Sequence, residues 1–356
     1  METLPTDISQ KELLNIVQVI ERRRIMKYVQ SLSEVNELKA SLIILRQWIC
    51  IALAWSLTLL VLYCFTGTVN ILQTISKLSI TEAAIVFFTY LCAIAIIASR
   101  QHALGILMHD GTHYRLFKNR VVNDVICDFF CSFPIGLSTN LYRREHIVHH
   151  QFVNTEKDPY VQSMSQDRDW DWPKTQFDCL KVIIFDLLAI NTSKWLNVLS
   201  HWMTSSNFFK VEAEKPLVAQ RERICFLSFV ACLVGLLWIT GAWLQFLIFW
   251  IIPGYTFLAM FTRMRSVAEH LMLENEHELN RTRHVDGTWF ERATIAPLYI
   301  NYHIAHHLFP SVPFYNLPKL HERLMEEEEF RMKAKLVPTY LGLRNGVLGE
   351  MIRKSA

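Results

Sequence analysis

The chain has 356 residues, of which 51% are apolar and only 19% are charged, and its mean hydropathy is positive at +0.19. A formal net charge of +3 without a long basic run gives no sign of a nucleic-acid-binding protein. The eight cysteines contain no CxxC pair, so neither a zinc ribbon nor a redox dithiol is indicated. This composition is typical of a membrane protein with a sizeable part in water.

Four apolar runs are long enough, or nearly so, to cross about 30 Å of hydrocarbon. They are Gln47–Thr66, Ala83–Ser99, Ile224–Ala242 and Trp243–Thr262. Two further apolar runs are too short and contain aspartate: Val125–Leu137 and Leu180–Ile190. We expect these two to lie at the membrane surface or to re-enter the membrane.

The basic residues predict the orientation of the spans. Lys and Arg are abundant before the first span, between the second and third, and after the fourth, whereas the first loop holds only Lys77 and the last loop none. The positive-inside rule therefore places both termini in the cytoplasm. We predict an all-α integral membrane fold of four transmembrane helices in two hairpins, with a helical cytoplasmic cap. The predicted parts are a charged lead-in over 1–46, one membrane domain over 47–356, and a cap formed by 100–223 and 263–356.

Histidines carry the strongest signal for function. Eight of the fourteen fall into three clusters: His109-Asp-Gly-Thr-His113, His146-Ile-Val-His149-His150 and His303-Ile-Ala-His306-His307. A single HxxHH should arise by chance roughly 0.02 times at this composition. Residues i, i+3 and i+4 share one face of an α-helix, so the imidazoles of each cluster project together.

Eight imidazoles exceed what one metal ion can use, and neutral imidazole is a good ligand for iron, copper and zinc. Two metal ions are the smallest number that can use all eight imidazoles. All three clusters lie in the segments expected in the cytoplasm, so they can converge. His270 follows the fourth span closely, and we expect it to be a ninth ligand.

One HxxxH and two HxxHH motifs resemble those of the membrane fatty acid desaturase and hydroxylase superfamily, and the likeness runs from the first span to His321. Further local matches are His149-His-Gln-Phe-Val-Asn154 with Asp158-Pro159, and Asn301-Tyr-His-Ile-Ala-His-His-Leu-Phe-Pro310. The isolated His270 also matches an extra ligand of that family. The resemblance implies a non-haem centre of two iron ions, molecular oxygen as co-substrate, and an acyl or other lipid substrate.

The resemblance also implies two electrons from a donor. No fused haem-binding donor domain is recognised, so we expect a separate electron-donor protein, either ferredoxin-like, rubredoxin-like or a b-type cytochrome. Ala305 stands where many related sequences have Glu. Some polar residues could form a hydrogen bond with the ring nitrogen of a ligand histidine that does not bind the metal. They are Asp110, Glu145, Asn154, Asp158, Glu269 and Asn301.

Within this superfamily the leading interpretation is desaturation of an acyl chain. Hydroxylation or ketolation of a lipid or carotenoid, which uses very similar motifs, stays open. A membrane zinc protease is a distant alternative, because Asp110 is a poor substitute for the glutamate of HExxH and six clustered histidines would have no role. A metal transporter is equally distant, since the four runs contain no histidine. The chain ends without a retention signal, which favours a bacterial inner membrane over the endoplasmic reticulum.

If His303 is a ligand, His303→Ala should abolish turnover without preventing membrane insertion, because this residue lies outside every predicted span. Activity assays on membranes, with the amount of inserted protein measured in parallel, test this. Full turnover in the variant would refute the assignment of His303.

Overall fold

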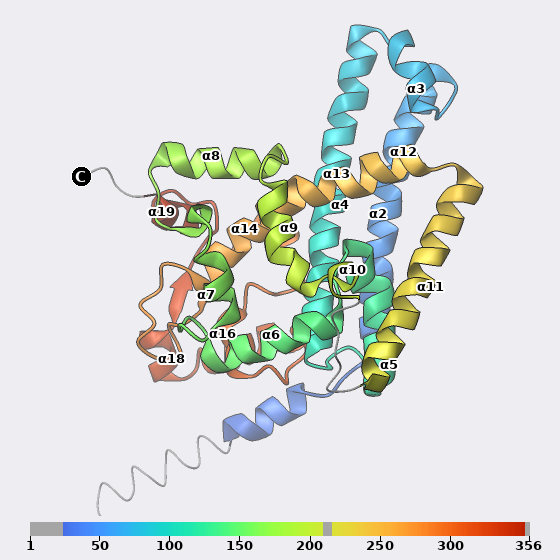
Figure 1. Ribbon diagram of the computed structural model, residues 1–356. Helices are drawn as coiled ribbons and strands as arrows, with labels where there is room; N and C mark the ends of the chain where they lie inside the picture. Colours follow the sequence, from blue (N-terminus) through green and yellow to red (C-terminus); the bar gives the residue numbers. More distant parts are fainter. Residues whose placement is uncertain (1–23, 209–215, 353–356) are drawn as a thin grey trace, which may run out of the picture.

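The computed structural model describes residues 24–208 and 216–352, so the first half of the predicted lead-in lies outside the described residues. The molecule is mostly helical (Figure 1). A helical stretch over 24–32 precedes the labelled elements. The helices of the first half are α2 (Glu37–Thr66), α3 (Ile71–Thr74), α4 (Ile80–Thr112), α5 (Arg120–Cys127), α6 (Thr139–Phe152), α7 (Pro159–Met164), α8 (Gln176–Leu187), α9 (Thr192–Leu199) and α10 (Thr204–Asn207).

The second half continues with α11 (Pro216–Thr240), α12 (Trp243–Phe246), α13 (Ile252–Tyr255), α14 (Phe257–His270), α15 (Trp289–Thr294), α16 (His303–Leu308), α17 (Leu317–Leu324), α18 (Glu328–Lys333) and α19 (Val347–Met351). Two three-residue strands, β1 (Arg283–Val285) and β2 (Lys335–Val337), pair in parallel, with Arg283 opposite Lys335. The all-α prediction is confirmed as a mostly helical fold, to which the structure adds this small sheet that the sequence analysis did not predict.

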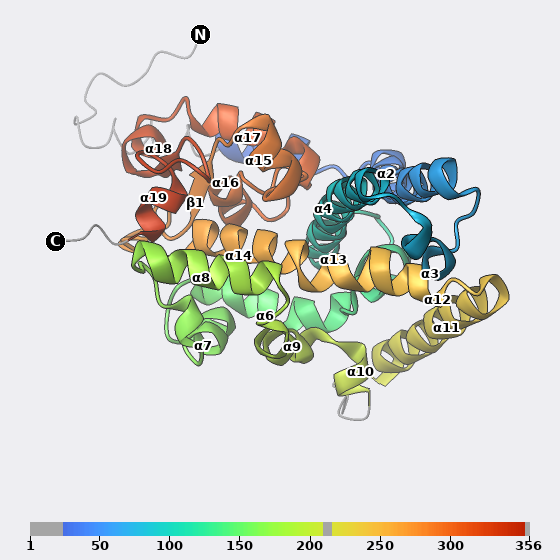
Figure 2. The same ribbon diagram turned by 90° about the horizontal axis from the view of Figure 1, so that it is seen from above.

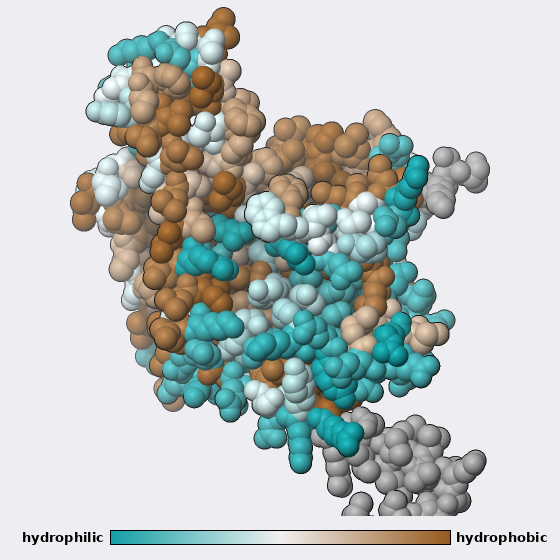
Figure 3. Space-filling view, turned by 180° about the vertical axis from the view of Figure 1, so that it is seen from behind, coloured by the Kyte–Doolittle hydropathy of each residue, from teal (hydrophilic) through white to brown (hydrophobic). Residues whose placement is uncertain are grey.

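Among the described residues, four helical segments are long and apolar enough to cross a membrane: Glu37–Thr74, Ile80–Thr112, Leu217–Thr240 and Trp243–His270. The four predicted runs lie within or largely within these segments. Large apolar side chains cover their outer surfaces, among them Leu53 on α2 and Ile239 on α11, which are 65% and 84% exposed. In Figure 3 such residues form a continuous hydrophobic column. An exposed apolar surface of this size is stable in lipid and not in water.

The second span is longer than the predicted run and does not stop at the membrane. Ser79 caps α4: its hydroxyl accepts from the Glu82 amide (3.3 Å), and the Glu82 carboxylate accepts from the Ser79 amide (2.8 Å). From there α4 continues unbroken for 33 residues to Thr112. This helix therefore carries the chain directly from the apolar run to the first histidine motif.

The fourth predicted span is not a regular helix. A π-helical turn over Leu247–Ile251 separates α12 from α13, and Thr256, with φ −118° and ψ −95°, separates α13 from α14. Pro253, which has no amide proton to donate, lies within this irregular stretch. In Figures 1 and 2, α12, α13 and α14 run across α4, whereas α2 lies along it. The two-hairpin arrangement and the cytoplasmic position of the cap stay predictions.

The two short apolar runs are bent, as expected of segments that do not cross the membrane in a straight line. Arg120–Ile135 meets α6 at 91°, and α8 meets the segment Thr192–Trp202 at 76°. Three large apolar side chains of α8 are exposed: Phe177, Leu180 and Ile184. This pattern suits a helix that lies on a membrane surface.

Buried apolar side chains form two clusters, and α4 contributes to both. Ile97, Leu104 and Leu107 pack with residues of α2, α5 and α17, while Ala98 and Ile106 pack with residues of α14 and the small sheet. The helix is thus held on two sides, which fixes the position of its histidine-bearing end.

Gly111 allows α4 and α5 to approach closely. A Cβ at this position would lie 2.5 Å from the Cys127 sulfur and 3.3 Å from its Cβ. We expect Gly111→Ala to lower the free energy of unfolding by about 1–3 kcal/mol, because overpacking forces the two helices apart. Thermal unfolding in detergent measures this.

Gly235→Ala, on α11, is the control, because nothing lies within 4 Å of a Cβ there. Adding Cys127→Ala to Gly111→Ala should recover part of the loss. Equal melting temperatures for the two single variants would contradict the role of Gly111.

Candidate metal centre

Nine histidines converge from four helices. Each HxxHH motif occupies one helix, α6 or α16, while His109 lies in the last turn of α4 and His113 at its C-terminal cap. His270 is the last residue of α14. All the residues predicted as metal ligands are therefore brought together: His109, His113, His146, His149, His150, His270, His303, His306 and His307.

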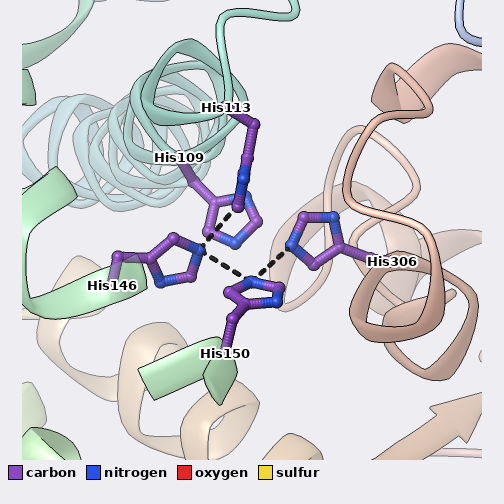
Figure 4. A group of neighbouring side chains, drawn as sticks. All are labelled: His109, His113, His146, His150 and His306. Atoms are coloured by element: carbon purple, nitrogen blue, oxygen red, sulfur yellow. Dashed lines mark hydrogen bonds between the residues drawn. The ribbon is translucent and has the colours of Figure 1, made fainter. Parts of the chain in front are cut away.

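Five of them form the first cluster, drawn in Figure 4. A ring nitrogen of each lies within 4.8 Å of the others, and the members are His109, His113, His146, His150 and His306. The Nε2 atoms of His146 and His113 are 3.0 Å apart, as are those of His150 and His146. Nε2 of His306 is 3.1 Å from Nε2 of His150. The rings point toward a common centre (Figure 4).

The other four histidines form the second cluster. Ring nitrogens of His149, His270 and His307 lie within 4.8 Å of one another. His303 joins them, with its Nε2 2.8 Å from that of His270 and 3.1 Å from that of His307. A carboxylate oxygen of Glu269 lies 3.7 Å from Nε2 of His303.

The HxxHH motifs are divided between the two clusters. In α6, His146 and His150 belong to the first cluster and His149 to the second; in α16, His306 belongs to the first and His303 and His307 to the second. The rings of His150 and His307 stack across the boundary, with centroids 4.2 Å apart. Adjacent residues on a helix point about 100° apart, so one helix can serve two neighbouring sites.

The residues fit a pair of cations. Burial, reinforced by neighbouring imidazoles, lowers the pKa of His303, His306 and His307 well below the ordinary value, so these rings are neutral at pH 7. Both ring nitrogens of His109 and Nε2 of His149 are buried without a hydrogen-bond partner. Neutral imidazoles whose lone pairs converge on one point are the donor set of a transition-metal site.

Asp158 holds one of these rings. Its Oδ2 lies 2.8 Å from Nδ1 of His149 and also accepts the amide of Asn154 (2.9 Å), while Oδ1 accepts the amide of Tyr160 (2.9 Å). A carboxylate on Nδ1 keeps the proton there and leaves the Nε2 lone pair for a metal. Asn154 itself has a positive φ of 57° and turns the chain back toward α6.

Tyr160 was not identified from the sequence. Its hydroxyl lies 3.0 Å from Nδ1 of His146, and its ring stacks on His149 with centroids 4.3 Å apart. The same turn that places Asp158 beside His149 therefore places a phenol beside His146. In the sequence, only its position two residues after Asp158 connects Tyr160 with the metal centre.

The remaining predicted polar residues have other contacts. The Asp110 carboxylate accepts a hydrogen bond from the amide of Phe314 (3.2 Å). The side chain of Asn301 donates to the carbonyl of Val285 (2.9 Å), and the side chain of Asn154 donates to the carbonyl of Arg281 (2.6 Å). These residues hold together the segments that carry the ligands.

Glu145 faces away from the metal ligands. Its carboxylate accepts Trp202 Nε1 (2.6 Å) and lies 3.4 Å from Nδ1 of His201. Position 145 adjoins His146 in the sequence, but on the helix it points to another side. Among the described residues, no hydrogen bond or ion pair found joins Glu145 to a predicted metal ligand, so its expected role in supporting a ligand has no contact behind it.

A cavity of about 160 Å³ adjoins the first cluster. His109, Met108 and Tyr142 line one part of it, and Trp170, Trp195 and Leu258 contribute largely apolar walls. The cavity is therefore a place where an apolar group can lie directly against a histidine of the candidate centre.

A family model for "Fatty acid desaturase" matches residues 83–335, which include all nine histidines. This chain belongs to the fatty acid desaturase family. Its relatives are oxidoreductases, and this chain is an enzyme of the same type.

Individual relatives are distant. A dihydrorhizobitoxine desaturase of Bradyrhizobium elkanii is 24% identical over 76% of this chain and 76% of its own length. A chloroplastic omega-6 fatty acid desaturase of Brassica napus is 28% identical over 62% of this chain, and the match spans only 50% of the plant protein. An sn-1 oleoyl-lipid 12-desaturase of Anabaena variabilis is 25% identical, with coverage of 62% and 64%.

If Asp158 orients His149, then Asp158→Asn should lower the metal affinity of the purified protein by about 10- to 100-fold. Competition with a metal chelator, followed by elemental analysis, measures this without an activity assay. Asp178→Asn, at the exposed start of α8, is the matched control. Equal metal retention in the two variants would contradict the role of Asp158.

Proposed function

We propose that this protein is an O2-dependent membrane oxidoreductase that introduces a double bond into an acyl chain with the help of two iron ions. The observation that carries this proposal is the pair of histidine clusters beside a mostly apolar cavity. His109 belongs to the first cluster and also lines the cavity. A methylene group in the cavity would therefore lie next to the site at which oxygen is activated.

The protein's own residues bind, orient and shield the reactants. His109, His113, His146, His150 and His306 would hold one ion, and His149, His270, His303 and His307 the other. Once bound, the iron pair supplies the activation of oxygen for removal of hydrogen from an unactivated carbon. Asp158 and Tyr160 keep the ligand rings in one orientation, and the buried surroundings exclude water.

The cavity holds a segment of the substrate. A dry apolar cavity of about 150 Å³ accepts a molecule the size of benzene, so one of about 160 Å³ accommodates roughly six carbons. The rest of a long chain would extend beyond it. Chain segments near the reacting carbons would thus be selected by fit against Leu258, Trp170 and Trp195.

The proposal also states in which membrane, and on which side of it, the reaction takes place. The distribution of basic residues favours cytoplasmic termini and a cytoplasmic metal centre. We favour a bacterial inner membrane on the sequence alone, since the relatives include bacterial, plant and nematode proteins. A separate protein would deliver the two electrons.

Hydroxylation or ketolation of a lipid or carotenoid is the second candidate, because the same histidine set supports insertion of oxygen. A zinc protease is disfavoured by the ligand count, since a catalytic zinc site uses three protein ligands and nine converge here. The three relatives named above are desaturases, which favours removal of hydrogen.

Product analysis tests the proposal. Iron-loaded protein is incubated with oxygen, a reducing system and membrane lipids or fatty acyl substrates, and the products are analysed by mass spectrometry. Desaturation predicts products that have lost two hydrogens. Products that have gained one oxygen would replace the proposal with hydroxylation.

We expect Leu258→Trp to fill part of the cavity and to lower turnover of long acyl chains by about tenfold or more, since overpacking costs about 1–3 kcal/mol. Short chains that leave the position empty should be affected less. Leu227→Trp, on the exposed surface of α11, makes the same change away from the cavity. Similar losses for both variants and all chain lengths would contradict the cavity assignment.

A further inference from the structure

A second groove lies away from the histidines, between the N-terminal part of α2, α4 and the segment around α15. It is open and has a volume of about 860 Å³. Its basic lining residues are Lys39 and Arg46 of α2, Arg100 of α4 and Arg292 of α15. No aspartate or glutamate is among the residues that line it. The groove therefore concentrates positive charge from three separate elements.

These four basic side chains are not paired with carboxylates. Throughout the described residues, none of the ion pairs found includes any of them. Arg100 donates to the side chain of Gln47 (3.1 Å) and to the carbonyl of Ala293 (2.6 Å), and Lys39 lies 4.4 Å from the ring centre of Tyr315. Arg46 and Arg292 are exposed. The groove thus presents cations to an anion that the described residues do not provide.

Apolar and aromatic side chains border the charge. Leu38 and Leu42 of α2 line the groove and are 70% and 55% exposed, on the helix whose outer side we assign to lipid. Trp289, 78% exposed, and Tyr299 lie on the opposite wall. In Figure 3 the hydrophobic column that includes α2 adjoins hydrophilic surface. Aromatic and basic residues at the edge of an apolar surface are typical of the membrane interface.

We propose that this groove binds the headgroup of an anionic phospholipid. The phosphate would lie among Arg46, Arg100 and Arg292, and an acyl chain would follow the exposed apolar side of α2. A soluble phosphate compound would use the charges alone, whereas the acyl chain of a lipid would also contact Ile49 and Leu53, which are exposed on the membrane side of Arg46. Basic pockets between transmembrane helices bind anionic headgroups in this way. The proposal goes beyond the proposed oxidation, and lipid binding would hold whether or not the enzyme desaturates.

Native mass spectrometry of the full protein in detergent tests this directly. Equal concentrations of phosphatidylglycerol and phosphatidylcholine are offered, and the retained lipid is identified. We expect preferential retention of phosphatidylglycerol. Removing one cation near a membrane surface costs about 1 kcal/mol, so Arg46→Gln and Arg292→Gln should each weaken binding about fivefold. Arg168→Gln, an exposed arginine outside the groove, is the matched control.

Equal retention of the two lipids by the unmodified protein would overturn the proposal. Equal weakening by Arg168→Gln would also overturn it, because the effect would then be one of overall charge. Soluble glycerophosphoglycerol, which is the same headgroup without acyl chains, should compete poorly. Competition as strong as that of the intact lipid would show a site for soluble phosphodiesters and would contradict a lipid site.

Discussion

The structure depends on nine buried or partly buried imidazoles whose ring nitrogens converge on two centres. In the first cluster Nε2 atoms approach to 3.0–3.1 Å, and in the second to 2.8–3.1 Å. A buried polar atom without a partner costs about 1–3 kcal/mol, and cations at the two centres would satisfy many such atoms at once. Metal binding and the stability of the folded state should therefore be coupled. The ligands come from residues 109 to 307, so this coupling extends over most of the chain.

Rigid helices position the ligands. α4 runs unbroken from the predicted membrane span to the first histidine motif and is packed on two sides, while α14 ends at His270. A movement of these helices in the membrane would therefore move the metal ligands directly. The proposed lipid groove adjoins the same helix about two and a half turns before His109, where Arg100 donates a hydrogen bond to the carbonyl of Ala293.

The amino-acid sequence predicted the membrane segments and the convergence of the histidines because both follow from simple periodicities. A long apolar run predicts a span, and the spacing i, i+3, i+4 predicts a shared helix face. Finer features depend on tertiary contacts. The division of His149 and His150 between two clusters required the positions of α14 and α16, and the apolar run of the fourth span gave no sign of the π-helical turn within it. Tyr160 reaches His146 only because the chain turns at Asn154, and Glu145 shows that adjacency in sequence does not imply adjacency in space.

The central claim is that two iron ions bind to these nine histidines. Elemental analysis of the protein purified in mild detergent tests it most directly, by giving both the identity of the metal and its ratio to the chain. The account predicts close to two irons per chain. A single zinc per chain, which iron added under reducing conditions neither displaces nor converts into an active enzyme, would contradict it.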